Sequence, residues 1–182
     1  VDRARVYGHM RLSHDIRPGE VHSALEETGS AWELSAIAFD QPRLFADVCG
    51  VLSYFGMDIL RGQAMTNRSG VALDLFQFTD RDDFFRLNKT GESQLTQLLD
   101  RVVAGREDID RTLRPKALGL AHRGPVRISP VIRFDNEYSK RFSIFEIVAQ
   151  DAWGLLYRIS QIISQHECDI ELVLIATEGN RA

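Results

Sequence analysis

The sequence lacks several features that mark large classes of proteins. No apolar run approaches the ~18–20 residues that a membrane-spanning helix needs. The first residues, Val1 to Arg5, lack the apolar core of a signal peptide, so nothing in the sequence indicates export. Cysteine is scarce, and Cys49 and Cys168 have no spacing typical of a disulfide framework or a metal site. We therefore expect a cytoplasmic protein with two reduced thiols and no membrane partner.

Basic patches and metal-ligand clusters are also missing. The net charge is −4 over 182 residues, and no dense Lys/Arg run is present, so a nucleic-acid partner is not expected. The histidines show no ligand-like spacing, and His14-Asp15 has no accompanying His–Asp set. No Gly-rich phosphate loop is found, and the acidic runs 80–83 and 108–110 are interpreted as solvated loops. We therefore predict no catalytic residue, metal or cofactor in this chain, while its parent protein is open to being an enzyme.

The most informative feature that is present is an internal repeat with an offset of 111 residues. Each copy runs from an apolar strand, through an aspartate and a turn, into an amphipathic helix and then a second strand. The matching positions are Ala38 and Ala149, Asp40 and Asp151, Leu44 and Leu155, Ser53 and Ser164, Asp58-Ile59 and Asp169-Ile170. A repeat of this kind decides the fold prediction, because both copies must adopt the same local structure.

Hydrophobic periodicity predicts the elements of the first copy. After a polar lead-in with a short helix at 18–25, we expect strands at 32–39, 57–66, 71–78 and 126–134, with helices from Pro42 to Gly56 and at 91–104. Charged loops are expected at 79–89 and after Gly105. Pro130 cannot donate a ladder hydrogen bond, so the last strand should be an edge strand or be interrupted.

The second copy is predicted to contain a strand at 142–149, a helix at 155–166 and a strand at 169–177. The expected fold class is therefore α+β, a ferredoxin-like βαββαβ arrangement with one complete unit and the first half of another. The predicted divisions are a lead-in at 1–30, a first domain at 31–134 and an incomplete second domain at 135–182. A half-unit leaves an unpaired strand edge, so we expect a fragment or a sheet completed by another chain.

These motifs resemble the ACT domain, a regulatory βαββαβ module that commonly binds amino acids. The resemblance covers about residues 31–182. It rests on Asp-x-Pro-x-Leu-Phe at 40–45, Gly-x-Asp-Ile at 56–59 and Gly-x-Ala-Leu-Asp-x-Phe at 70–76. The lead Asp135-Asn136-x-x-Ser139 into Gly154-Leu155-Leu156-Tyr157 is similar to the tandem ACT region of the bifunctional uridylyltransferase/uridylyl-removing enzymes, which act on the PII signalling protein.

The resemblance implies an allosteric module that senses a small amino acid, glutamine being favoured, and controls a nitrogen-regulating uridylyltransferase, a nucleotidyltransferase. Helix N-termini attract anions, so the loop after each first strand is expected to hold the ligand carboxylate while an aspartate takes the ammonium group. The candidate ligand-binding residues are Asp40, Arg43, Leu44, Phe45, Asp58, Asp151, Gly154 and Leu155. The expected partner is another ACT unit, within the chain or in a homodimer or larger assembly.

Two departures keep alternatives open. The first copy has Arg43 where the family usually has Gly, and the second has Trp153 where Pro is usual. Both side chains fill space that a ligand would use, which favours a ligand-free interaction or dimerisation module. Arg43 could instead reach a carboxylate with its guanidinium. A further alternative is a regulatory fragment of another ACT-bearing enzyme of amino-acid metabolism.

Overall fold

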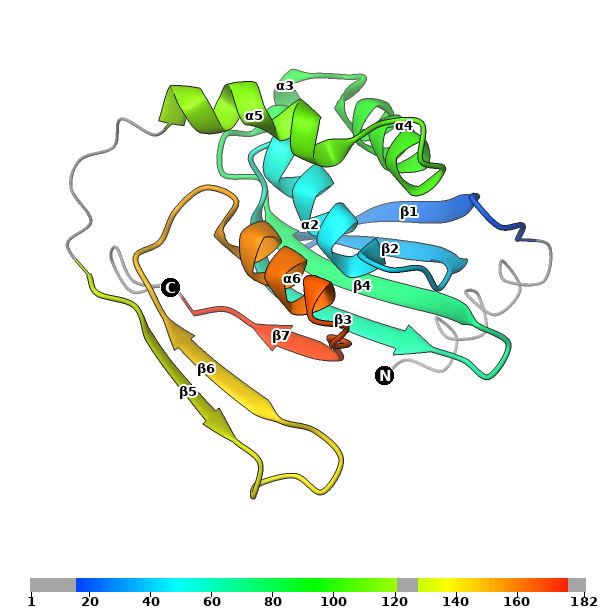
Figure 1. Cartoon of the computed structure of the whole chain (residues 1–182). Coiled ribbons are helices and arrows are strands. Elements are labelled where there is room, and N and C mark those ends of the chain that lie inside the picture. Colours follow the sequence, from blue (N-terminus) through cyan, green and yellow to red (C-terminus); the bar gives the residue numbers. More distant parts are fainter. Residues whose placement is uncertain (1–15, 121–127, 177–182) are drawn as a thin grey trace.

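The computed structural model describes residues 16–120 and 128–176, and it has the predicted mixed α+β architecture (Figure 1). An antiparallel five-stranded sheet has the order β1-β2-β4-β3-β7, and two further strands form a separate hairpin, β5-β6. The strands are β1 Val21–Thr28, β2 Ala31–Phe39, β3 Asp58–Thr66, β4 Val71–Thr79, β5 Val131–Asp135, β6 Ile144–Val148 and β7 Leu172–Leu174. The helices are α2 Leu44–Tyr54, α3 Phe84–Leu87, α4 Gly91–Val103, α5 Ile109–Leu120 and α6 Leu155–Gln165.

The helices lie on one side of the sheet and bury the apolar stripes predicted from the sequence (Figure 1). On α2, Val48 and Leu52 are fully buried, as their helical spacing requires. On β4, Ala72, Phe76 and Phe78 alternate with more exposed neighbours and face the same core. The strand and helix predictions for residues 31–79 and 91–103 are therefore confirmed. None of the helices within the described ranges is long and apolar enough to cross a membrane.

The expected helix at 18–25 is wrong, because this segment is part of strand β1. β1 pairs with β2 from Val21↔Ala38 to Thr28↔Ala31. A two-residue link, Gly29-Ser30, joins them, and Gly29 has a φ of 65°. Such a turn between two β-capable runs is the usual sequence signal of a hairpin. β1 thus takes the sheet edge that the predicted fourth strand was expected to fill.

The predicted fourth strand lies elsewhere. Of the predicted residues 126–134, only 131–134 lie in a strand, β5, and residues 126–127 lie outside the described residues. The partner of β5 is β6 of the second copy. Pro130 directly precedes β5, in agreement with the expected interruption. Every residue of β5 is exposed, so the β5-β6 hairpin adds little to the core. The division into domains at residues 30 and 134 stays a prediction.

Two regions predicted as charged loops contain helices. α3 occupies 84–87, where the Asp80 carboxylate accepts hydrogen bonds from the backbone of Phe84 and Phe85. α5 follows Asp108, whose carboxylate accepts hydrogen bonds from the backbone N–H groups of Asp110 and Arg111 at its first turn. Ile109 and Leu113 of α5 are buried in the core. Arg111 and Arg114 of this segment lie on the exposed face of an amphipathic helix, whereas Asp110 is only partly exposed.

Candidate functional site

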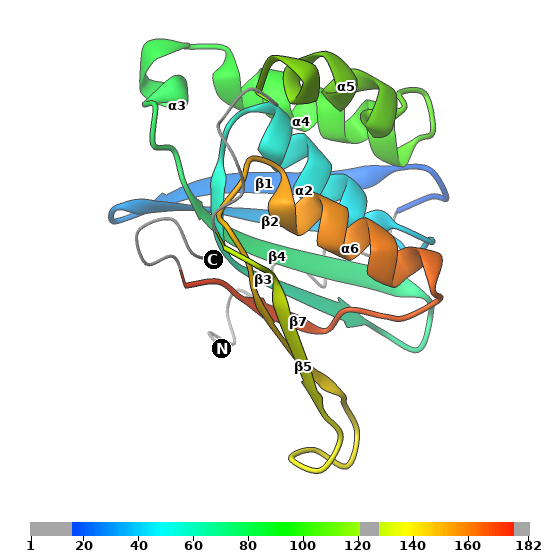
Figure 2. The same ribbon diagram turned by 60° about the vertical axis from the view of Figure 1, so that its left-hand side comes forward.

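The two copies of the repeat pair with each other inside the chain. β3 of the first copy and β7 of the second are antiparallel, and Gly62 pairs with Val173 at the centre of their register. Helices α2 and α6 pack side by side above these strands (Figure 2). There Sγ of Cys49 lies 4.0 Å from Oγ of Ser160, and both side chains are buried. Gly62 and Val173, like Cys49 and Ser160, are separated by the repeat offset of 111, so a local two-fold axis passes between equivalent residues.

The loops that open α2 and α6 have the same backbone conformation. Arg43 precedes α2 with φ 73° and ψ 1°, and Gly154 precedes α6 with φ 67° and ψ 19°. These two residues are also separated by the repeat offset. Only glycine reaches this left-handed region without steric cost, so Arg43 holds it at a cost of about 1–2 kcal/mol. No side chain caps either helix.

In the first copy, the groups predicted to bind a ligand have partners within the chain. Asp40 accepts a hydrogen bond from the Thr66 hydroxyl at 3.1 Å, and the backbone N–H of Leu44 donates to the carbonyl of Gln41 at 3.1 Å. The side chains of Leu44 and Phe45 are buried in the core. The Phe45 ring lies against Gly62, where an added Cβ would come within 2.7 Å of it. Leu44, Phe45 and Gly62 therefore have a packing role here.

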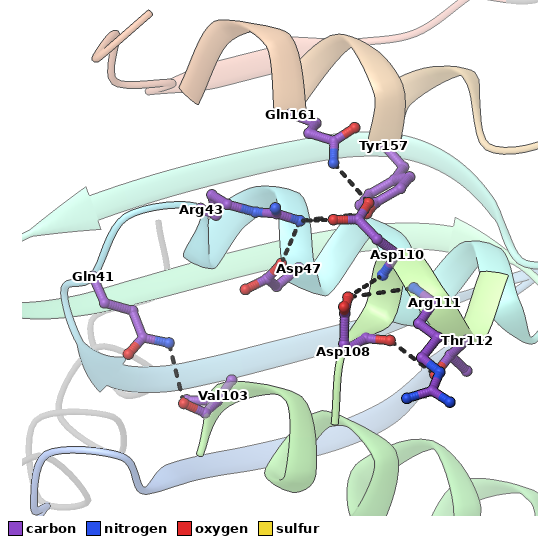
Figure 3. A network of polar contacts seen from close by, with 10 residues as sticks. All are labelled: Gln41, Arg43, Asp47, Val103, Asp108, Asp110, Arg111, Thr112, Tyr157 and Gln161. Atoms are coloured by element: carbon purple, nitrogen blue, oxygen red, sulfur yellow. Dashed lines mark hydrogen bonds and ion pairs between the residues drawn. The ribbon is translucent and has the colours of Figure 1, made fainter. Parts of the chain in front are cut away.

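Arg43 belongs to a polar network that joins three helices (Figure 3). Its Nη2 atom lies 3.0 Å from Oδ2 of Asp110 on α5 and 3.4 Å from Oδ1 of Asp47 on α2. It also donates a hydrogen bond of 3.4 Å to the hydroxyl of Tyr157 on α6. The Tyr157 hydroxyl and the Gln161 side-chain amide both donate to Oδ1 of Asp110, the latter at 2.6 Å. The expectation that residues 108–110 form a solvated loop is therefore wrong.

The network shifts the titration of its members. Partial burial acts to raise the pKa of Asp110, but hydrogen bonds from Tyr157 and Arg43 outweigh it and hold the pKa below its ordinary value. Burial raises the pKa of Asp47 to about 6, although Arg43 opposes this shift. Burial and the hydrogen bond to Asp110 raise the pKa of Tyr157, which keeps its hydroxyl a donor. Asp110 is thus the carboxylate that Arg43 and Tyr157 stabilise most.

The loop of the second copy is more open. Within the described part of the chain, the exposed Asp151 makes no hydrogen bond or ion pair, and a Cβ at Gly154 would meet nothing within 4 Å. The backbone N–H of Leu155 donates to the carbonyl of Ala152 at 3.0 Å. The indole N–H of Trp153 donates to the carbonyl of Ser53 at 2.9 Å, which ties this loop to the first copy.

Asp58 begins β3 directly after α2, the helix whose Ser53 carbonyl is hydrogen-bonded to Trp153 of this loop. Its Oδ2 pairs with Nε of Arg81 at 2.6 Å. Burial raises the pKa of Asp58, Arg81 opposes the shift, and the neighbouring charge of Asp151 adds to it. Asp58 and Asp151 are therefore close enough to interact electrostatically across the junction of the two copies. Of the predicted residues, the structure brings together Asp58, Asp151 and the loop before α6.

Sequence reasoning missed Asp47, Asp110, Tyr157 and Gln161. One signal was available: Tyr157 and Gln161 lie four residues apart and therefore on one face of α6. The position of Asp110 had no such signal, because it depends on how α5 docks. Among the described residues, no group of three or more His, Cys, Asp or Glu side chains is arranged to hold a metal ion. His14-Asp15 lies outside the described residues.

Comparison with curated proteins supports the resemblance seen in the motifs. The chain is 26% identical over its whole length to a bifunctional uridylyltransferase/uridylyl-removing enzyme of Nitrobacter hamburgensis, and it spans 20% of that protein. It is 27% identical, over 96% of its length, to the protein of the same name from Gluconobacter oxydans, of which it spans 19%. It is 28% identical, over 89% of its length, to the protein of the same name from Bradyrhizobium diazoefficiens, of which it spans 17%. The chain therefore spans about a fifth of the length of these relatives, and it matches no known family profile and no solved structure.

Proposed function

We propose that this chain is the regulatory region of a protein similar to the bifunctional uridylyltransferase/uridylyl-removing enzymes, and that it binds a small amino acid, glutamine being favoured. The observation that carries this proposal is the pairing of the two copies about a local two-fold axis. The hydrogen bond from Trp153 to Ser53 supports a site that joins the loop before α6 of one copy to Asp58 of the other. A ligand bound there would touch both copies, so its binding would depend on how the copies are arranged.

The chemistry of this junction suits an amino-acid zwitterion. The first turn of α6 has no side-chain cap, so its backbone N–H groups and the helix dipole favour a carboxylate. Asp151 and Asp58 supply two carboxylates beside it, of which Asp151 makes no other hydrogen bond or ion pair within the described residues. These two oxygen acceptors suit the ammonium group. Gly154 leaves the loop open, in contrast to Arg43 in the first copy.

Regulation then follows from differential affinity. A ligand shifts an equilibrium only by as much as it prefers one arrangement over the other. A zwitterion that bridges Asp58 and the loop before α6 favours the paired arrangement of the copies. In a protein like the relatives, that preference would be passed to a catalytic neighbour that transfers or removes uridylyl groups. Control of the PII signalling protein in nitrogen regulation is part of this proposal.

A second candidate function is a ligand-free pairing module. Two contacts favour it: the Trp153 indole is hydrogen-bonded to the first copy, and the Arg43 side chain is engaged by Asp110. Both side chains strengthen pairing without a ligand. The same experiment separates the two functions.

The test is a calorimetric titration of the folded chain with glutamine, followed by other common amino acids. We expect saturable binding of glutamine that Asp151→Ala abolishes and that Asp100→Ala, a change on α4 away from this junction, leaves intact. Heat that is unaffected by Asp151→Ala would contradict the proposed site. A folded sample that binds no amino acid would contradict the proposed function and favour the pairing module.

A further inference from the structure

The carboxylate of Asp110 is held by donors from both copies of the repeat. Nη2 of Arg43, from the first copy, lies 3.0 Å from its Oδ2. The Tyr157 hydroxyl and the Gln161 side-chain amide, from the second copy, donate to its Oδ1 (Figure 3). Asp110 belongs to neither copy of the repeat, because it lies on α5, which follows α4 in the sequence. A segment between the copies thus places one carboxylate in a cluster of donors that the paired copies create.

We propose that Arg43, Tyr157 and Gln161 form a carboxylate-binding site that Asp110 occupies as an internal ligand. The carboxylate of a free amino acid competes with Asp110 for this site and, when it binds, releases α5. The donor set supports this: a guanidinium, a hydroxyl and an amide, all directed at one carboxylate, are the groups that proteins use to bind free carboxylates. The Arg43 and Asp110 side chains are 32% and 33% exposed, so a solute can reach them.

Arg43 also lines an open pocket of about 200 Å³, which has room for a small ligand. Its lining includes Arg43, Asp47, Glu107 and Asp108. The volume is below the ~300–1,000 Å³ of sites for drug-sized molecules, which favours a small ligand. An ammonium group that enters this pocket meets three acidic side chains. The lining of the pocket therefore favours an α-amino acid over a simple carboxylate.

Competition would act on the position of α5. Asp110 lies in the first turn of this helix, next to Ile109, which is buried against α2. Replacing the Asp110 carboxylate at Arg43 would remove the polar anchor of the first turn of α5 and leave its apolar contacts and the hydrogen bond from Lys116 to the Tyr54 carbonyl. An internal competitor acts at an effective concentration in the millimolar range, so a free ligand must bind weakly while Asp110 is in place. Removing the Asp110 carboxylate should therefore strengthen ligand binding.

The test is nuclear magnetic resonance of the isotopically labelled chain during titration with glutamine, with the side-chain NH₂ signals of Gln161 as the reporter. We expect the apparent Kd measured at Gln161 to fall at least about tenfold in Asp110→Ala, as follows from removal of a millimolar internal competitor. Asp100→Ala on α4 is the matched control and should leave the Kd unchanged. Asp110→Asn, which keeps the shape of the residue, should give a smaller gain in glutamine affinity. It replaces the alanine variant if that variant does not fold.

Two results would overturn the proposal. One is a silent Gln161 in folded Asp110→Ala and Asp110→Asn at glutamine concentrations of about tens of millimolar, because neither variant keeps the carboxylate that acts as the internal competitor. The other is a Gln161 response that survives the addition of Arg43→Gln. The backbone amide of Gly154 reports separately on the junction site proposed above. A Gly154 response with a silent Gln161 supports the junction site and refutes the Arg43 site. A Gln161 response with a silent Gly154 supports the Arg43 site and refutes the junction site.

Discussion

At Arg43 and Gly154, two very different residues fill the same left-handed position before a helix. In the second copy, glycine meets the conformational demand and leaves the loop open. In the first copy, arginine meets it at a cost that its contacts with Asp47, Asp110 and Tyr157 offset. The sequence alone showed that Arg43 departs from the family pattern. It could not show which carboxylate the guanidinium would reach, because Asp110 comes from a helix that was not predicted.

Gly154→Ala should destabilise the chain by about 1 kcal/mol, because the backbone there has a φ of 67° and no neighbouring atom would clash with the new Cβ. The loss therefore measures backbone strain alone. Gly154→Asn should cost less, since asparagine tolerates the left-handed region better than other side chains. Urea denaturation of the three proteins gives the comparison. Equal stability of the alanine variant and the parent would show that Gly154 does not hold this conformation.

Asp74 is the most deeply buried acidic side chain of the described residues, with 2% of its surface exposed. Burial, with a smaller contribution from Asp40, raises its pKa from 3.8 to about 7. One of its carboxylate oxygens has no hydrogen-bond partner. The folded chain therefore binds a proton at Asp74 in a pH range where the unfolded chain has already lost it. Stability should fall as the pH rises from about 4 to about 7.

Asp74→Asn tests this directly, because asparagine keeps the shape and does not ionise. The melting temperature of the variant minus that of the parent should grow from about pH 4 to about pH 7 and then level off. Other titrating groups contribute equally to both proteins and cancel in the difference. A difference that is constant across this range would show that Asp74 titrates normally.

At the level of elements, α2 and α6 approach closely because α2 has glycine at the crossing. A Cβ at Gly50 would lie 2.7 Å from Cγ1 of Ile109 and 3.0 Å from the ring of Tyr157. Glycine usually weakens a helix interior. At position 50 it lowers the helix propensity of α2 but allows α5 and α6 to pack closely against it. In the second copy the equivalent position is Gln161, whose side chain reaches Asp110 instead.

Gly50→Ala should destabilise the chain by about 1–3 kcal/mol, since overpacking outweighs the gain in helix propensity of at most ~1 kcal/mol. Chemical denaturation gives the value. Adding Ile109→Ala, which removes the nearest atom, should recover part of the loss, so that the two changes are not additive. A stabilised Gly50→Ala variant would mean that α2 and α6 lie further apart than described.

The sequence predicted the elements of the first copy well and their partners less well. Periodicity located β2, α2, β3, β4 and α4, because each buries one face against the same core. It misplaced β1, since Val21–Thr28 has weak alternation and its Gly-Ser turn was not recognised. It also assigned 126–134 to the first sheet, whereas β5 pairs with β6. Pairing between strands depends on tertiary contacts that a local pattern does not contain.

At the scale of the whole molecule, two pairs of residues that are 111 positions apart in the sequence lie next to each other in the structure. The pairs are Gly62 and Val173 in the sheet and Cys49 and Ser160 between the helices. The repeat predicted that two similar units exist and that another unit would be the partner. The junction of the two loops and strands follows from the pairing, and the proposed ligand site depends on it. Both therefore require that the two copies pair in this register within one chain.

Disulfide cross-linking between β3 and β7 tests whether the two strands pair in this register. Backbone hydrogen bonds from Ile175 to Leu60 and from Ala64 to Glu171 make Arg61 and Leu174 a non-hydrogen-bonded pair. Cα atoms of such a pair are about 4.5 Å apart, within the range that a disulfide spans. The variant is Arg61→Cys with Leu174→Cys, and the control with a slipped register is Arg61→Cys with Leu172→Cys. Both carry Cys168→Ser to remove the exposed thiol.

Mass spectrometry of the oxidised, monomeric chain gives the result. If the strands pair in this register, the 61–174 pair cross-links almost completely within the chain and the 61–172 pair cross-links little. Equal cross-linking of both pairs, or cross-links formed only between chains, would contradict the pairing of the copies and the ligand site built on it.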